Sequence, residues 1–387
     1  MPNYNFDEIV DRKNTYSLKW DFAKERGKKE NILPFWVADM DFKLPNEIIN
    51  PLIDKIKEGV FGYSDPKDDY FEAIKNWYLK HYNVNIDKAS IIINSSVVFS
   101  ICTLIKILIK ESDAILINEP VYYPFKSSIV DNNRKAISSN LKFNGNRYEI
   151  DYVDFENKIR KYNIKLYILC NPHNPVGRVW DKDELEKIIS ICNKYNVFII
   201  SDEIHADFCY QKAFYSIANF KTNYAIVSAF TKTFNIPGLK IAHTIIPNKL
   251  IYKEYKKELD RIGYSQQSIL GLVATKSAIL HGDNWLNELK KYLWDNIIFI
   301  EDYLKKYLPK IKFVKPEGTY LIWLDFNEYN LSHKELNLLI DKANLWLDDG
   351  VIFGKSGKGY QRINIATQKK NIVILLNNLY EVFKDLK

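Results

Sequence analysis

The sequence predicts an α/β protein, with a large domain built on a mostly parallel sheet flanked by helices and a smaller α/β domain after it. Near-continuous apolar runs, typical of strands buried on both faces, recur along the first two thirds of the chain, at 90–93, 114–117, 165–170, 197–200 and 224–228. Helical patterns separate these runs, as in parallel sheets covered by helices on both sides. A length of 387 residues also exceeds one ordinary core, which favours two domains.

Helix start signals support this division. Ser96 is placed to cap a helix that begins near Val97, and Asp181 and Glu184 have the spacing of a capping box. A long amphipathic pattern over 285–307 predicts the helix that leads into the second domain. That domain would contain strands at 312–314, 320–324 and 362–365, and helices after Ser332 and near Lys369. We therefore expect an N-terminal arm at 1–45, a large domain at 46–284 and a small domain at 285–387.

Composition excludes several classes of function. The net charge is +7, but basic and acidic residues are interspersed, so we expect no nucleic-acid binding. The six histidines and four cysteines show no metal-ligand spacing, and we expect no metal and buried free thiols. The N-terminus lacks the features of a signal peptide, and the apolar stretch 97–109 is too short to cross a bilayer. These observations predict a cytoplasmic protein without a membrane partner.

Polar residues that carry chemistry follow the predicted strands. They are Ser96, Tyr122, Asn174, Asp202 and Lys232. Parallel sheets bind ligands at the carboxyl ends of their strands, so these side chains are expected to meet at one edge. The convergence of five such positions is the main physical argument for a site.

Asp202 and Lys232 are the centre of that site. Asp202 directly follows a buried strand and needs a cationic partner, while Lys232 lies in a predicted loop before a Pro-Gly turn. A desolvated lysine loses its charge readily and can form a Schiff base with an aldehyde. The pair alone is compatible with a salt bridge, a proton relay or the two poles of a cofactor site.

The other candidates have two interpretations each. Tyr122 is either a core residue or a flat ring for stacking a cofactor, and Asn174 is either a turn former or a ligand. Arg362, within an apolar strand, needs an anion, which is either a structural carboxylate or a bound one. The segment 34–42, PFWVADMDF, is either an arm packed on the body or a lip of the site. The stretch 350–356, GVIFGKS, is one residue short of a phosphate loop, so we expect a turn there.

Several ordered motifs resemble those of the pyridoxal 5'-phosphate (PLP) enzymes with the aspartate-aminotransferase fold, fold type I. They are KWD at 19–21, PFWVADMDF at 34–42, GY at 62–63, CNPHNPVGRVW at 170–180, SDEIHAD at 201–207, KTFNIPG at 232–238, PEGTY at 316–320 and RINIA at 362–366. The resemblance covers nearly the whole chain. Within the family it is strongest to the C–S lyases of the cystathionine β-lyase and cysteine desulfhydrase type.

The resemblance implies a role for each matching residue. Lys232 would be the Schiff-base lysine, Asp202 the partner of the ring nitrogen, Tyr122 the stacking ring and Arg362 the clamp for the substrate carboxylate. Asn174 and His205 would lie at the phenolic oxygen of the cofactor. The phosphate would be held by Ser96, Val97, Val98, Ser228 and Thr231, and by Tyr63 of a neighbouring subunit. Substrate contacts are expected from Val37, Ala38, Asp39 and Tyr63. Relatives often carry serine at position 229, where this chain has Ala229, and glycine at position 96.

The reaction implied is β-elimination from cystathionine, cysteine or another S-substituted cysteine, giving pyruvate, ammonia and a thiol or sulfide. Lys232 would remove the α-proton, and Asp202 would keep the ring nitrogen protonated. Transamination on the same scaffold is the first alternative, and a regulatory protein that retains the cofactor is the second. The match at Tyr63 implies a homodimer with shared sites.

Overall fold

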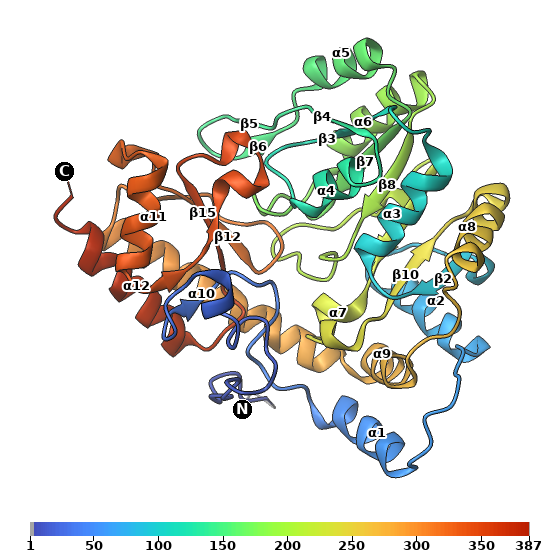
Figure 1. Ribbon diagram of the computed structural model, residues 1–387, viewed down its shortest axis with the longest axis horizontal. Helices are drawn as coiled ribbons and strands as arrows, with labels where there is room; N and C mark the ends of the chain where they lie inside the picture. The colour runs from blue at the N-terminus through green and yellow to red at the C-terminus, as the bar shows by residue number, and fades with distance from the viewer. Residues whose placement is uncertain (1–3, 387) are drawn as a thin grey trace.

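The computed structural model describes residues 4–386, and a seven-stranded sheet forms its centre (Figure 1). Its strand order is β2-β10-β9-β8-β7-β3-β4. The strands are β2 (Ile91–Asn94), β3 (Ala114–Ile117), β4 (Lys135–Ser138), β7 (Leu166–Cys170), β8 (Phe198–Asp202), β9 (Tyr224–Ser228) and β10 (Ala242–Ile245). All five strands expected for the large domain are present. Strands β4 and β10 were not predicted.

Most neighbouring strands of this sheet are parallel. The pairs β3·β4, β3·β7, β7·β8 and β8·β9 are parallel, whereas β10 runs antiparallel to both β9 and β2. In register, Asp202 lies opposite Cys170 on one side and Val227 on the other. The carboxyl ends of three strands therefore meet beside Asp202. The predicted mostly parallel sheet is confirmed, with one reversed strand.

Helices cover both faces of the sheet (Figure 1). One apolar cluster joins the sheet to α3 (Val97–Leu108), α4 (Pro124–Val130) and α8 (Lys249–Arg261). The other cluster joins it to α2 (Asp68–Tyr82), α5 (Tyr152–Tyr162), α6 (Lys182–Lys194) and α9 (Ile269–His281). Helix α1 (Asn46–Lys57) packs on α9. The two apolar faces explain why the strands read as continuous hydrophobic runs.

The predicted helix starts are confirmed. The Ser96 side chain accepts a hydrogen bond from the Phe99 amide at the start of α3. Capping boxes begin α6, at Asp181, and α11 (His333–Lys342), at Ser332. Helix α10 (Asp283–Tyr307) extends from the central sheet region to a second, smaller sheet (Figure 1).

The second sheet has the order β11-β12-β15-β14 and is antiparallel. Its strands are β11 (Lys312–Phe313), β12 (Leu321–Asp325), β14 (Asp348–Asp349) and β15 (Tyr360–Asn364). Helices α10, α11 and α12 (Lys369–Phe383) lie beside it (Figure 1). Two 3₁₀ turns, Gly350–Phe353 and Lys355–Gly357, connect β14 to β15, so the 350–356 stretch is a connection between strands, as expected. The domain limits at 45 and 284 stay predictions.

The N-terminal segment packs against the small sheet region. Strand β1 (Leu33–Pro34) pairs in parallel with β13 (Leu345–Trp346), and Trp36 stacks on Trp346. A short hairpin of β5 (Lys142–Phe143) and β6 (Tyr148–Glu149) completes the strands. Residues 1–3 of the predicted arm and residue 387 of the predicted small domain lie outside the described residues.

Candidate active site

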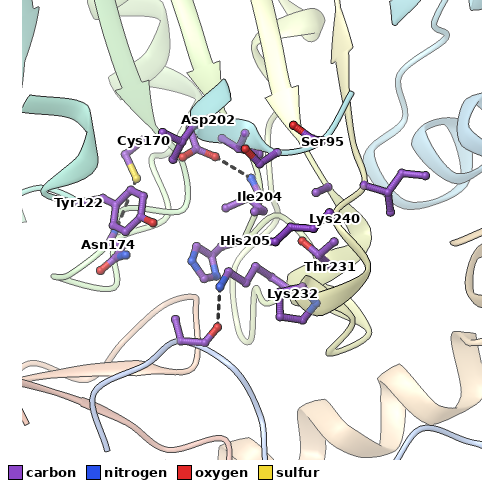
Figure 2. Close-up of a pocket in the computed structure, with 17 residues that line it drawn as sticks. Ser95, Tyr122, Cys170, Asn174, Asp202, Ile204, His205, Thr231, Lys232 and Lys240 are labelled. Carbon is purple, nitrogen blue, oxygen red and sulfur yellow. Dashed lines mark hydrogen bonds between the residues drawn. The ribbon is translucent and has the colours of Figure 1, made fainter. Parts of the chain in front are cut away.

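A cavity of about 240 Å³ lies at the carboxyl ends of the parallel strands (Figure 2). Ten of the residues singled out in the sequence line it: Ala38, Ser96, Val97, Val98, Tyr122, Asn174, Asp202, His205, Thr231 and Lys232. They come from the N-terminal segment and from the turns after β2, β3, β7, β8 and β9. The sheet therefore assembles side chains that are far apart in the chain, as expected for this edge.

Asp202 and Lys232 lie on opposite sides of the cavity (Figure 2). Among the ion pairs of residues 4–386, none joins the two side chains, so the salt-bridge interpretation is wrong. Burial raises the pKa of Asp202 to about 7, although its Oδ1 accepts a hydrogen bond from the Ile204 amide at 3.1 Å. Burial lowers the pKa of Lys232 to about 8, against the opposing attraction of Asp39. A carboxylate with no cation beside it faces an amine that loses its proton easily.

Lys232 lies on a one-turn helix, α7 (Phe230–Thr233), so the prediction of a loop is wrong. Asp207 anchors this helix, because its buried carboxylate accepts a hydrogen bond from Thr233 Oγ1 at 2.5 Å. The same carboxylate also accepts from Trp77 Nε1 at 3.1 Å and from Tyr82 OH at 2.5 Å, both on α2. The lysine is thereby held on a rigid support. Asp207 ends the SDEIHAD motif but was not among the predicted site residues.

Residues 34–42 are both an arm and a lip of the cavity. The Ala38 carbonyl accepts a hydrogen bond from Lys232 Nζ at 2.6 Å, which Figure 2 shows as a dashed line. Asn235, three residues after the lysine, exchanges hydrogen bonds with the Met40 backbone at 2.8 and 2.9 Å. Val37 and Asp39, predicted to contact substrate, flank Ala38 but do not line the cavity.

The two aspartates of the lip have cationic partners. Arg12 bridges Asp39 and Asp41 at 2.7 and 2.8 Å, and buried Lys19 pairs with Asp41 at 2.6 Å. These pairs hold the lip in place, since removal of one partner would leave a buried charge uncompensated. The importance of Arg12 was missed, because it is 27 residues from Asp39 and belongs to no recognised motif.

Tyr122 and Asn174 lie together on one side of the cavity, and His205 lies nearer to Lys232 (Figure 2). Asn174 Oδ1 accepts a hydrogen bond from Arg362, which leaves the amide of Asn174 as a donor. His205 is buried, and its Nδ1 has no hydrogen-bond partner among the described residues. Burial lowers the pKa of His205 to about 3, so its ring is neutral. An unpartnered polar atom at this depth indicates a ligand that the protein is built to meet.

The remaining side of the cavity suits an anion. Ser96 caps α3, and the first-turn amides at Val97 and Val98 have no partner inside a helix. Ser95, Thr231 and Lys240 also line the cavity, on the side opposite Tyr122 and Asn174 (Figure 2). Neither Ser95 nor Lys240 was predicted. Lys240 directly follows the 3₁₀ turn Pro237–Leu239, which contains the Pro-Gly pair, and a cation so close to Lys232 in the sequence was the available signal.

Ser228 was expected to hold the phosphate, but it does not line the cavity. Its hydroxyl instead donates a hydrogen bond to the Glu203 carbonyl at 3.2 Å. Because Ala229 offers no hydroxyl either, the anion-binding side depends on Thr231, Lys240 and the start of α3.

Arg362 and Tyr63 lie outside the cavity lining. Arg362 on β15 reaches the site through Asn174, at 2.9 Å. Tyr63, after α1, is 97% exposed and lies with Phe61 and Gln267 on the surface. The single chain therefore does not bring Tyr63 to Lys232.

The residues present fit PLP. The cofactor has a ring nitrogen that can carry a proton, an aldehyde and a phosphate. The cavity offers, in the same order, the Asp202 carboxylate, the Lys232 amine and the anion-binding side at α3 and Lys240. The unpartnered Nδ1 of His205 lies between them. Within residues 4–386, no group of three or more histidine, cysteine or acidic side chains is arranged to hold a metal ion. None of the described helices is both long enough and apolar enough to cross a membrane.

Comparisons with known proteins agree with this site. The model of the family "Aminotransferase class I and II" matches residues 30–379. Cystathionine beta-lyase PatB of Bacillus subtilis is 34% identical over 366 residues, which cover 93% of this chain and 95% of PatB. The PLP-containing structure of cystalysin from Treponema denticola is 34% identical with a TM-score of 0.95, covering 99% of this chain and 100% of cystalysin. A PLP-bound candidate aminotransferase from Clostridium difficile 630 is 42% identical with a TM-score of 0.96, covering 98% of this chain and 100% of that one.

Proposed function

The chain belongs to the aminotransferase class I and II family, and we propose that it is a PLP-dependent C–S β-lyase. Its substrates are cystathionine, cysteine or other S-substituted cysteines, and its products are pyruvate, ammonia and a thiol or sulfide. The observation that carries the proposal is the cavity in which Lys232 and Asp202 face each other without forming an ion pair. The similarity to PatB and cystalysin favours elimination over transamination.

The residues around the cofactor divide into three groups. When bound, PLP supplies an aldehyde that condenses with amines and a ring that accepts the electrons released at the α-carbon. Asp202 would pair with the ring nitrogen, Tyr122 would stack on the ring, and the Asn174 amide and His205 would bind the phenolic oxygen. The phosphate would be held by Ser96, Val97, Val98, Thr231 and Lys240, which line the cavity.

The residues around the substrate perform positioning and proton transfer. Arg362 would bind the α-carboxylate and so fix the direction of the Cα–H bond that is broken. The Lys232 amine removes the α-proton, and the lowered pKa of about 8 keeps part of this amine neutral near neutral pH. The Cβ–S bond breaks and the sulfur leaves with the bonding electrons. The remaining enamine takes a proton at its β-carbon to become an imine, which water hydrolyses to pyruvate and ammonia. The Ala38 carbonyl holds the lysine when its amine is free.

Two alternatives remain on the same scaffold. Transamination differs only in where the carbanion is reprotonated, and the similarity to the Clostridium difficile protein is the observation that favours it. A regulatory protein that retains PLP has no specific observation in its favour. The test is a product assay over cystathionine, cysteine and S-methylcysteine without any keto acid. We expect pyruvate and a thiol from at least one of them. Turnover that requires an added keto acid would replace the lyase proposal by the aminotransferase.

Lys240 gives a prediction about cofactor binding. We expect Lys240→Ala to weaken PLP binding by roughly 10-fold to 100-fold, because a charge-assisted hydrogen bond to a bound anion contributes about 1.5–3 kcal/mol. The measurement is the dissociation constant of PLP, from absorbance titration of the cofactor-free protein. Lys249→Ala is the matched control, because Lys249 is an exposed lysine at the start of α8 that does not line the cavity. Equal affinities in the two variants would remove Lys240 from the phosphate site.

The surface around Tyr63 gives a prediction about assembly. Val60, Phe61 and Tyr63 are 69%, 56% and 97% exposed, an unusual concentration of apolar surface in one short segment. We propose that this segment packs on a second copy of the chain and that Tyr63 reaches the phosphate of the partner's cofactor. The enzyme is then a homodimer with shared sites.

Mixing two defective variants tests this. In a hybrid of Tyr63→Ala and Lys232→Ala subunits, one site receives an intact Tyr63 and an intact Lys232. Random exchange should restore roughly a quarter of the wild-type sites. The control mixture, Lys232→Ala with Arg362→Ala, restores none, because both residues act in the same subunit. Activity that is equal in the two mixtures would contradict shared sites.

We also propose a cytoplasmic location. All four cysteines are free thiols, and three of them, Cys170, Cys192 and Cys209, are buried. Free thiols persist in reducing compartments. Detection of the enzyme only in a secreted fraction would contradict this.

A further inference from the structure

The clamp residue Arg362 is paired with a carboxylate that no motif predicted, Asp348. Strand β14 lies antiparallel to β15, and the register places Asp348 directly opposite Arg362. The two side chains form an ion pair and are only 8% and 4% exposed. A guanidinium and a carboxylate on facing positions of neighbouring strands meet without backbone adjustment.

Three hydrogen bonds and one ring contact hold the guanidinium of Arg362 in one orientation. One terminal nitrogen donates to Asn174 Oδ1 at 2.9 Å. The other donates to the Trp36 carbonyl at 2.9 Å and to Asp348 Oδ2. The guanidinium carbon also lies 4.8 Å from the centre of the Phe353 ring. A long, flexible side chain becomes a specific clamp only when such contacts restrict it.

Two donors of Arg362 are left over. Its Nε is buried and has no hydrogen-bond partner among the described residues. The terminal nitrogen bound to Trp36 and Asp348 already uses both of its hydrogens. The contacts therefore leave the Nε–H, on the edge that the other terminal nitrogen shares, and one N–H of the nitrogen beside Asn174, which is the one next to a residue of the cavity lining.

The buried positive charge of Arg362 gives a second argument for the role of Asp348. A buried guanidinium without an anion is costly, and Lys232 is a second cation near the same site. Asp348 supplies the anion when no substrate is bound. Its neighbour Asp349 is engaged elsewhere, with the Val351 amide at 3.2 Å and Asn337 Nδ2 at 2.7 Å, so Asp348 alone of the two contacts Arg362.

We infer that Asp348 is a positioning residue, which holds the Arg362 guanidinium so that the free N–H of the nitrogen beside Asn174 faces the substrate α-carboxylate. The inference rests on the proposed role of Arg362 as the carboxylate clamp. Asp348 does not line the cavity, and it acts through Arg362 alone.

The test compares two amines that differ in the carboxylate. L-alanine has no β substituent to lose, and ethylamine is its counterpart without the carboxylate. Their dissociation constants for the holoenzyme are measured by the change in cofactor absorbance. The ratio of the ethylamine constant to the L-alanine constant reports the clamp. We expect Asp348→Ala to lower this ratio at least about 10-fold, the effect of losing a hydrogen bond to a charged group. Asp348→Asn keeps an acceptor in place and should remain within about 3-fold of wild type.

Two further variants separate the possible failures. Asp349→Ala removes the adjacent carboxylate and should leave the ratio unchanged. Arg362→Ala should lower the ratio as far as any variant does; a normal ratio there would overturn the clamp itself, and with it that part of the proposed function. If Arg362→Ala does lower the ratio, three results would overturn the inference. Asp348→Ala could leave the ratio unchanged, or it could weaken the binding of both amines equally. The ratio in Asp348→Asn could also be as low as in Asp348→Ala. Asp348→Ser gives the same comparison if the alanine variant does not fold.

Discussion

Replacement of Lys232 by alanine is expected to lower pyruvate formation by at least about 100-fold, the lower range for loss of a positioned acid–base group. The amine is the only one in the described part of the chain that both lines the cavity and contacts its lip, through the Ala38 carbonyl at 2.6 Å. Lys240, the other lysine of the lining, lies on the anion-binding side. Lys240 therefore cannot replace Lys232 without a change in the turn.

The measurement combines turnover with the spectrum of bound PLP. We expect Lys232→Ala to lose the visible band of the lysine-linked cofactor as well as turnover, because both depend on the same nitrogen. Lys249→Ala is the control and should match wild type in both. Wild-type turnover in Lys232→Ala would refute the assignment of this lysine.

The central sheet was predictable wherever its strands are apolar on both faces. Strand β10 was missed because its middle residues are His243 and Thr244, which read as polar. Both are buried, and each has a partner from another element: Tyr78 OH for His243 at 2.9 Å and Asn94 Nδ2 for Thr244 at 2.8 Å. Such pairing depends on tertiary structure, so hydrophobic periodicity could not reveal it.

The site residues also divide into those that a local sequence pattern reveals and those that depend on tertiary contacts. Residues that follow a buried strand, such as Asp202 and Asn174, could be predicted because sheet topology places them at one edge. Asp207, Arg12 and Asp348 were missed. Each acts on a neighbour that is far away in sequence, on Thr233, Asp39 and Arg362 respectively. Spacing along one chain carries no signal for such contacts.

Asp202→Asn is expected to lower activity without lowering the stability of the cofactor-free protein. In the cofactor-free protein, burial raises the pKa of Asp202 to about 7, and its Oδ1 needs to accept only the Ile204 amide. Asparagine keeps that acceptor and removes a buried charge that has no cation beside it. The cofactor-free variant should therefore unfold at the same temperature as wild type or at a higher one.

In the holoenzyme, the same substitution should be harmful, because it should lower turnover. Without the carboxylate, the protonated ring nitrogen of bound PLP has no counter-ion, and loss of one partner of a buried pair costs about 3–5 kcal/mol. We expect turnover to fall by at least about 100-fold, the equivalent of roughly 2.7 kcal/mol. Thermal unfolding of the cofactor-free protein and pyruvate formation by the holoenzyme measure the two effects.

The neighbouring carboxylate provides the control for Asp202. Glu203 is equally buried, and burial raises its pKa to about 7 as well, but it faces away from the cavity. It accepts hydrogen bonds from Ser201 at 2.9 Å, Ser216 at 2.8 Å and the Ile217 amide at 2.9 Å. Glu203→Gln loses an acceptor there, so it should destabilise the protein by about 1–3 kcal/mol and leave turnover per folded molecule near wild type. If Asp202→Asn instead behaved like Glu203→Gln, Asp202 would be a structural carboxylate and not the partner of the ring nitrogen.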